Sequence, residues 1–275
     1  IGLKAKIIDP RSSNANVGKA EIGLRLATGS ENNPVSTNQT MGDAFNKDTL
    51  LVDRAYLKYS FSPIEEFMWA IPAFSLTGGR MPNPWLYTNL VWDDDLNFEG
   101  AALSYTTDSL ASAPFSVFLT GGLFSLEEVK FSDKDKWLWG AQMGFNLRPS
   151  SSYNFKIAGA YYDYLNITGE ANDPTRPNAK DYTAPAFQQK GNSLMDIDPS
   201  EDVKTALAAE FKIVNVTAKL TLDFFFPTQI VLWGDYALNI GFDKDDVAER
   251  TGNVLVKEET QGYQYGLLLG YPKIS

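Results

Sequence analysis

Residues 136–147, Lys-Trp-Leu-Trp-Gly-Ala-Gln-Met-Gly-Phe-Asn-Leu, alternate between apolar and polar side chains. In an extended chain, one face would carry Trp137, Trp139, Ala141, Met143, Phe145 and Leu147. The other face would carry Gly140, Gln142, Gly144, Asn146 and Arg148, and Leu138 is the exception to the pattern. A two-residue period sustained over about ten residues is typical of a β-strand with one apolar and one polar face. The stretch therefore predicts a strand of this kind.

The same alternation recurs in residues 19–27, 216–224 and 261–271. A soluble β-sandwich would also alternate, so the pattern alone does not separate it from a membrane barrel. Two features favour the barrel, namely the mixture of small and charged residues on the polar faces and the aromatic residues at the ends of the apolar faces. Such aromatics are typical of the girdles at a membrane interface, and the candidates are Tyr59, Phe61, Trp137, Trp139, Tyr263 and Tyr271.

The expected strands are separated by gaps that alternate in length. We expect strands near residues 2–8, 18–29, 49–61, 66–80, 95–107, 114–125, 136–147, 153–165, 207–224, 229–241 and 260–271. The short gaps are 9–17, 62–65, 108–113, 148–152 and 225–228, and the long polar gaps are 30–48, 81–94, 126–135, 166–206 and 242–259. Short turns at one rim and long loops at the other are typical of outer-membrane barrels.

The predicted fold class is therefore all-β, an antiparallel transmembrane β-barrel, with residues 1–275 as one domain. Eleven strands are readable, whereas bacterial single-chain barrels have an even number. We therefore expect either that the sequence is incomplete at one or both ends or that the count is wrong by one. The chain begins at Ile1 with no signal peptide, so a leader was removed or the start is not included.

The composition excludes several classes of function. The chain has no histidine and no cysteine, which excludes a Ser-His-Asp triad, histidine-ligated metals, disulfides and thiolate zinc sites. Its 24 basic and 34 acidic residues give a net charge of −10, which argues against nucleic acid as a partner. Nothing marks a pair of catalytic carboxylates. We expect no enzyme, no catalytic residue, no metal and no cofactor.

Two motifs in the middle of the chain resemble a known family. Residues 79–85 read Gly-Arg-Met-Pro-Asn-Pro-Trp, and residues 90–100 read Leu-Val-Trp-Asp-Asp-Asp-Leu-Asn-Phe-Glu-Gly. Together they resemble the GR-x-PNP and WD-x-DL-x-x-EG motifs of the putative porins of Gram-negative bacteria. Further matching pieces follow the order of that family, namely Arg25–Gly29, Gln39-Thr40, Arg54–Leu57, Tyr161–Tyr164 and, more loosely, Gly234–Tyr236.

The resemblance implies an outer-membrane porin with a complete barrel of about 16 strands. It further implies a homotrimer in the outer membrane of a Gram-negative bacterium, with lipid and lipopolysaccharide as surroundings. The C-terminal aromatic residue of such barrels and a periplasmic N-terminal extension are both missing from the sequence.

Charged residues on the expected polar faces are the candidate pore lining. We expect the lumen to be lined by Arg25, Arg54, Arg80, Lys156, Lys219 and Asp235, with Asp93 and Asp94 as opposing loop acids. Such an arrangement would set up a transverse field that orients permeating solutes. In the alternative, the arginines pair with neighbouring acids such as Glu21 or Asp53 and only stiffen the wall.

The long loops carry further candidates. For Asp93-Asp94-Asp95 we favour a structural loop end over a cation site, because the spacing of a calcium loop is absent. For Trp85 and Trp92 we favour packing against the wall or at the interface over stacking on a solute. The segment 166–206 either enters the lumen or stays at the surface, and both alternatives remain open. The acidic run Asp243, Asp245 and Asp246 is expected to be a solvated tip.

The predicted function is passive diffusion of ions and small hydrophilic solutes through a water-filled channel. Two alternatives stay open. One is a barrel that acts as a scaffold or sheath for a partner protein, and the other is a soluble carbohydrate-binding β-sandwich. The sequence leaves open the preferred solute, the ion selectivity, the oligomeric state and the full number of strands.

Overall fold

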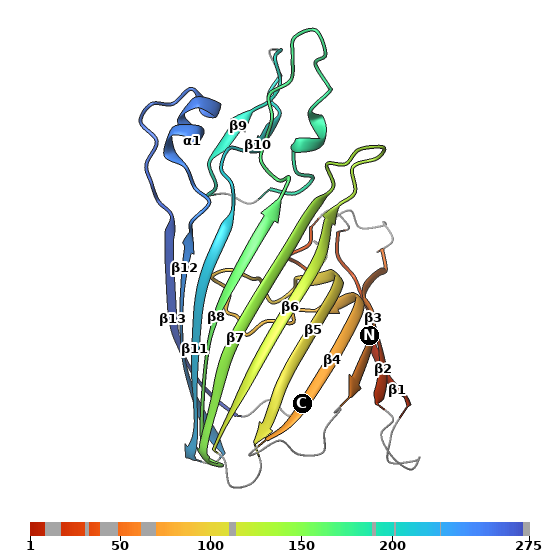
Figure 1. Cartoon of the computed structure of the whole chain (residues 1–275), viewed down its shortest axis with the longest axis vertical. Helices are drawn as coiled ribbons and strands as arrows, with labels where there is room; N and C mark the ends of the chain where they lie inside the picture. Colours follow the sequence, from red (N-terminus) through yellow and green to blue (C-terminus); the bar gives the residue numbers. More distant parts are fainter. Residues whose placement is uncertain are drawn as a thin grey trace, which may run out of the picture.

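The computed structural model describes residues 1–8, 18–30, 33–38, 49–61, 70–109, 114–188, 191–200, 202–225 and 227–271. Eleven antiparallel strands form one sheet, in which each strand pairs with the next along the chain (Figure 1). They are β1 (Gly2–Ile8), β2 (Lys19–Ala27), β3 (Leu51–Phe61), β4 (Ala70–Pro82), β5 (Asn97–Ser109), β6 (Phe115–Glu127), β7 (Lys136–Ser150), β8 (Tyr153–Leu165), β11 (Lys212–Phe225), β12 (Thr228–Asn239) and β13 (Gln261–Gly270). Each overlaps one of the eleven strands expected from the sequence, which confirms the predicted antiparallel fold.

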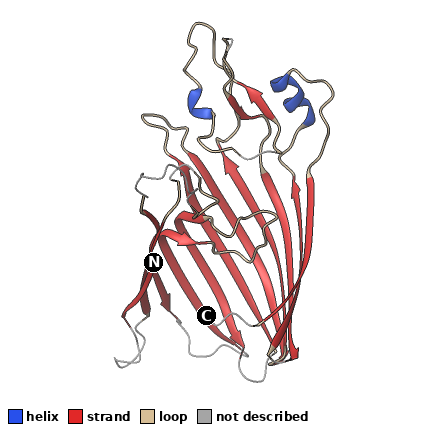
Figure 2. Cartoon of the chain, turned by 180° about the vertical axis from the view of Figure 1, so that it is seen from behind, coloured by secondary structure: helices blue, strands red, loops and turns tan. Residues whose placement is uncertain are grey.

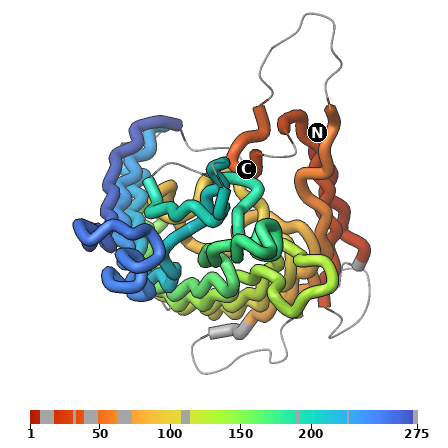
Figure 3. Tube along the Cα trace, turned by 90° about the horizontal axis from the view of Figure 1, so that it is seen from above, coloured from red at the N-terminus to blue at the C-terminus, as the bar shows by residue number. Residues whose placement is uncertain are grey.

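The sheet curves into a wall that is open in the described part of the chain. Viewed from above, the strands follow an arc around a concave side (Figure 3). Strands β1 and β13 are the two edges of the sheet and do not pair with each other, so the expected closed barrel is observed as an open curved sheet. The expected gaps 9–17 and 62–65 and the pair Gln39-Thr40 lie outside the described residues.

The two faces of the sheet differ as the alternation predicted. On β7, Met143 and Phe145 are 50% and 47% exposed, whereas Gln142, the residue before Met143, is 3% exposed and faces the concave side. On β13, the register pairs Tyr263 with Tyr236 on the outer face and Gln264 with Asp235 on the inner face. Leu138, which broke the pattern in the sequence, is buried on the concave side. The exposed apolar face is therefore the convex one, where a barrel meets lipid.

Aromatic residues gather near both ends of the outer face. Near the short-turn end, ring centroids are 5.8 Å apart for Tyr59 and Phe61, 5.5 Å for Phe61 and Phe74, and 4.9 Å for Phe74 and Tyr105. Near the opposite end, Trp139 and Tyr161 are 5.3 Å apart. Two such groups are what interfacial girdles require. In the described residues, no helix is both long and apolar enough to span a membrane.

A small cap lies beyond the long-loop ends of the strands (Figure 1). The segment between β8 and β11 contributes a short 3-10 helix, Asp181–Thr183, and a two-stranded sheet of β9 (Leu194–Asp196) and β10 (Thr205–Leu207). The segment between β12 and β13 contributes α1 (Lys244–Thr251). The two segments share a buried core made of Met195, Ile197, Ala206, Ala208, Ala209 and Val247.

Asp243, Asp245 and Asp246 are exposed, as expected for a solvated tip, but they also begin this helix, which the sequence did not predict. The Asp243 carboxylate accepts hydrogen bonds from the backbone N–H groups of Asp245 (2.8 Å) and Asp246 (3.2 Å). Such caps satisfy donors that have no partner inside the helix. At the other end, Gly252 has a φ of 66°, the left-handed conformation that commonly ends a helix.

We predict that the cap loosens in acid. The pKa of Asp181 is lowered by its hydrogen bonds with Lys204 and Asn172, so the carboxylate is stabilised in the folded cap. Its contribution to stability is therefore present above the unfolded pKa, about 3.9, and is lost as the pH falls through the lower folded value. At neutral pH, trypsin should cleave after Lys204 faster in Asp181→Asn than in the parent. At about pH 2, where Asp181 of the parent is protonated as well, pepsin should cleave the caps of the two proteins at the same rate. The Asp133→Asn variant, which changes an exposed aspartate outside the cap, should cleave like the parent.

Candidate functional site

The connection between β4 and β5, residues 83–96, turns back across the concave face of the sheet (Figure 2). Three of its side chains accept hydrogen bonds from backbone N–H groups two residues further on. Asn83 accepts from Trp85 (3.0 Å), Thr88 from Leu90 (3.3 Å), and Asp93 from Asp95 (2.8 Å). Such short side-chain turns fold a loop compactly without strand partners. The hydrogen bond that the Asp93 carboxylate accepts is typical of the structural loop end we expected. We call residues 83–96 the inward loop.

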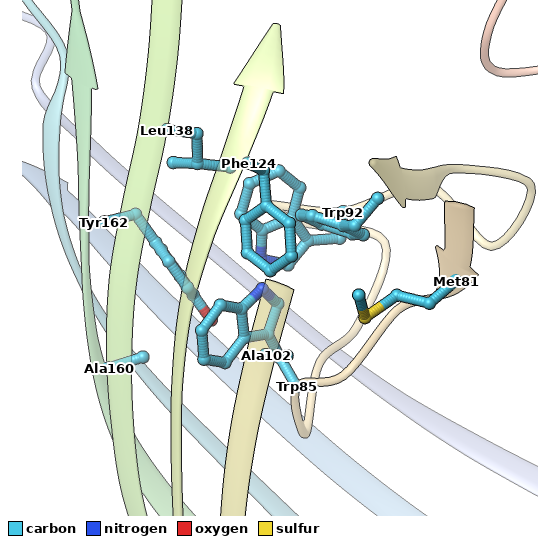
Figure 4. Packing of buried hydrophobic residues seen from close by; sticks show 9 residues of the cluster. Met81, Trp85, Trp92, Ala102, Phe124, Leu138, Ala160 and Tyr162 are labelled. Atoms are coloured by element: carbon cyan, nitrogen blue, oxygen red, sulfur yellow. The ribbon is translucent and has the colours of Figure 1, made fainter. Parts of the chain in front are cut away.

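Two tryptophans fix the inward loop to the wall (Figure 4). Trp85 and Trp92 are both 5% exposed and meet the ring of Tyr162 on β8, with centroids 5.3 and 5.0 Å away. The rest of this apolar cluster comes from strands β4 to β8 and consists of Met81, Phe98, Ala102, Phe124, Leu138 and Ala160. The predicted packing of both tryptophans against the wall is therefore confirmed.

Gly140 makes this close packing possible. A Cβ atom at this position would lie 2.7 Å from Cδ1 of Tyr162 and 3.3 Å from Cζ2 of Trp85. The first distance is shorter than carbon atoms tolerate, and the Tyr162 ring is fully enclosed, so it has no room to move away. The glycine on the inner face of β7 therefore leaves the space that the two rings fill.

Polar groups hold the inward loop at two further points. Gln142 on β7 clamps the backbone of Leu86, because its Nε2 donates to the Leu86 carbonyl (2.8 Å) and its Oε1 accepts from the Leu86 N–H (2.7 Å). On β12, the Asp235 carboxylate accepts from the Thr88 hydroxyl (2.6 Å). Asp235 is 6% exposed and also accepts from Asn215 and Thr217. It faces inward as predicted, but it serves as an anchor of the loop and is shielded from water.

Arg25 and Arg54 meet around Asp53. The Asp53 side chain is paired with Arg25 Nε and accepts a hydrogen bond from Asn97 Nδ2 (2.8 Å). Arg54 Nε is 3.9 Å from the same carboxylate and donates to Asn97 Oδ1 (2.7 Å). A shift in the pairing of β2 with β3 occurs between Arg25 and Leu26, where Asp53 is the extra residue. Such a bulge places two consecutive side chains, here Asp53 and Arg54, beside one partner.

Tyr87 of the inward loop links Arg54 to the loop acids. Burial raises the pKa of the Tyr87 phenol, the charge and hydrogen bond of Asp94 raise it further, and the charge of Arg54 opposes them. The Tyr87 hydroxyl therefore lies within the fields of both an acid and a base. That Arg54 and Asp94 face each other across the lumen stays a prediction.

Arg80 lies at the long-loop end of β4. Its Nε donates to the Asp53 carbonyl (3.1 Å), and its Nη1 is 3.4 Å from the Glu99 carboxylate. It lines a cavity of about 480 Å³ together with Asp53, Asp95 and Phe187. Because Phe187 belongs to the segment 166–206, that segment reaches from the cap to the β2–β3 side of the mouth. In the described residues it lies above the strand ends, not among them (Figure 1).

Comparison with known proteins identifies the family. The family described as putative porin matches residues 12–275. The chain belongs to this putative porin family. No curated protein matches it closely enough to count as a relative. Among solved structures, it is similar to the outer membrane channel DcaP of Acinetobacter baumannii, with 12% identity, a TM-score of 0.44, and coverage of 100% of this chain and 74% of that chain.

The last two predicted lining residues of this porin lie on its inner wall, away from the inward loop. Lys156 on β8 and Lys219 on β11 are directly paired in the register. The structure thus gathers Arg25, Arg54 and Arg80 near the mouth and separates Lys156 and Lys219 from them. That all of these residues line the conduction path stays a prediction.

Sequence reasoning missed several residues that position the site of this porin. Asn97 was not singled out, and Asp53 was named only as a neighbour of the arginines. Gln142 and Thr88 gave no signal as loop anchors, because their partners lie 56 and 147 residues away in the chain. Tyr87 was not singled out either. The one cue for it in the sequence was its place in the same loop as Trp85, Trp92 and the three aspartates 93–95.

Proposed function

We propose that this porin forms a water-filled channel through which ions and small hydrophilic solutes diffuse passively. The observation that carries the proposal is the division of the sheet into two faces. The convex face carries exposed apolar side chains between two aromatic groups, and the concave face carries buried and half-buried charges. This division matches lipid outside and water inside.

The mechanism contains no chemical step. Solutes partition into the lumen, and the inward loop reduces its cross-section where Arg54, Tyr87 and Asp94 interact. Selectivity follows from the width of the channel and from the charges at this constriction. We infer that the protein is not an enzyme, that it binds no cofactor, and that nucleic acid is not a partner. Family membership supports the inference.

We further propose the surroundings in which this channel works. These are the outer membrane of a Gram-negative bacterium, with lipid and lipopolysaccharide around a single-domain barrel and three copies forming a homotrimer. The exposed outer face and the porin family support this placement.

Single-channel recording of the full-length protein in a planar bilayer tests the function. We expect stable openings in potassium chloride, with a current proportional to the salt concentration. Folded, membrane-inserted protein that passes no current would contradict the proposal and would favour the alternative of a barrel that sheathes a partner. A stoichiometric partner that copurifies with the protein would mark that outcome.

We predict that reversing the charge of the mouth arginines changes ion preference. Arg54→Glu and Arg80→Glu are two separate variants, and each replaces a positive charge by a negative one. Tyr87 already lies near Arg54, and Asp53 and Asp95 line the same cavity as Arg80. The reversal potential in a salt gradient should shift towards cations in both variants, because the local potential becomes negative. The Lys130→Glu variant changes an exposed loop residue and should leave the reversal potential unchanged. An unchanged value in both arginine variants would place these residues outside the conduction path.

A further inference from the structure

Three basic side chains lie together on the inner wall near the short-turn end of the sheet. Lys156 on β8 pairs in the register with Lys219 on β11 and, on its other side, with Asn146 on β7. Arg148 follows Asn146 by two residues on the same strand face, and both Arg148 and Lys219 act electrostatically on Lys156. We call Arg148, Lys156 and Lys219 the basic triad.

No carboxylate of the described residues forms an ion pair with the triad, in contrast to three other inner-face cations. Lys4 lies 3.0 Å from Glu21, Lys136 lies 2.7 Å from Glu127, and Arg25 pairs with Asp53. No carboxylate of the described chain lies within 4.0 Å of a basic atom of Arg148, Lys156 or Lys219. Like charges directly opposite each other on neighbouring strands destabilise a sheet. In the described part of the wall, these three cations therefore lie together with no carboxylate in contact.

The nearest acids along these strands are already engaged. Lys219 pairs with Trp233 on β12, and Asp235 follows Trp233 by two residues on the same face. Asp235, however, accepts hydrogen bonds from Thr88, Asn215 and Thr217. Asp223, four residues beyond Lys219, accepts from Gln229 Nε2 (2.6 Å). Both carboxylates keep their negative charge, but these hydrogen bonds hold them away from the triad, and neither forms an ion pair with Arg148, Lys156 or Lys219. The position in direct contact with the three cations is therefore left to a mobile anion.

We propose that Arg148, Lys156 and Lys219 form a binding site for a small divalent oxyanion on the inner wall of the channel. The inference rests on the proposed channel function and deepens it by naming a solute class. A guanidinium can bind two oxygens of one oxyanion, and each ammonium adds a point charge with rotatable donors. Asn146 and Asn154 lie on the same strand faces and add neutral amide groups beside the cations. A site below the inward loop would concentrate such anions along the path.

The test uses inorganic phosphate on the full-length protein, with sulfate as a second probe of the same chemistry. Chloride current through single channels is recorded while phosphate is added to the side of the short turns. We expect phosphate to reduce the current of the parent protein, and the Lys156→Gln/Lys219→Gln variant to need a roughly tenfold higher concentration for the same effect. Sulfate should behave like phosphate, since the site recognises charge and oxygen geometry.

The matched control is Lys4→Gln, which removes an inner-face lysine that has a carboxylate partner. It should keep the phosphate response of the parent. Equal phosphate sensitivity in the parent and the double variant, or no effect of phosphate on a conducting parent, would overturn the site and leave the channel function intact.

A second readout separates the site from the channel. Phosphate binding to the detergent-solubilised protein, followed by line broadening in phosphorus NMR, needs no conductance. Binding that is lost in the double variant but kept in Lys4→Gln supports the site even if no current is measured, in which case the proposed channel function fails alone. Retention of the folded form of each variant is checked by its mobility in unheated electrophoresis.

Discussion

A Trp85→Ala/Trp92→Ala variant should release the inward loop and widen the channel. Both indoles are buried against Tyr162, and truncation of a buried tryptophan costs about 3–5 kcal/mol at one site. The hydrogen bonds of Leu86 and Thr88 to the wall are not expected to offset such a loss, because each contributes about 1 kcal/mol. Single-channel recordings should show a larger mean current with frequent fluctuations, as the freed loop moves in and out of the lumen.

The matched control for this variant is Trp139→Ala. Trp139 is 39% exposed on the outer face and takes no part in the inward-loop cluster. Its removal should leave the mean current and the current noise at the level of the parent. A double variant with the conductance of the parent would show that the inward loop does not limit the channel.

An Asp53→Asn variant should make the channel more selective for anions. Asp53 is 9% exposed and is the carboxylate shared by Arg25 and Arg54. Removing one partner from a buried ion pair costs about 3–5 kcal/mol, and the partly exposed arginines lower that figure because water screens them. We expect reduced thermal stability together with a shift of the reversal potential towards anions, since two cations lose their counter-charge.

Glu258→Gln is the control for the change in net charge. This exposed residue lies on the segment between α1 and β13, far along the chain from the arginines, and its variant should keep the reversal potential of the parent. If Asp53→Asn left the ion preference as it was while destabilising the protein, Asp53 would have only a structural role. The arginines would then stiffen the wall, as in the alternative considered for the sequence.

The strands were predictable because lipid and water impose a two-residue period on a chain that separates them. Residues 136–147 show this period directly, and the structure places the predicted apolar face outside. Leu138 broke the pattern for a reason that no local window contains, since its partners come from the inward loop and neighbouring strands. The long-range contacts of a loop leave no periodic trace in the sequence.

The cap was not predicted, because its elements are short and depend on each other. Strands β9 and β10 have three residues each, and α1 has eight, which is too few to be stable alone in water. Asp243 gave a helix-start signal that was interpreted as a solvated acid. Its meaning depends on Val247 being buried against Met195 and Ile197 of a distant segment.

The anchor of the inward loop at Asp235 has a consequence for the order of assembly. Thr88 and Asp235 are 147 residues apart, and the wall strands β5, β6, β7, β8 and β11 lie between them in the chain. Closing so long a chain segment becomes favourable only when most of the intervening sheet has formed. The loop can therefore dock fully only on a nearly finished wall. Until then the growing sheet presents a wide interior, and the narrow passage is one of the last parts of the molecule to take shape.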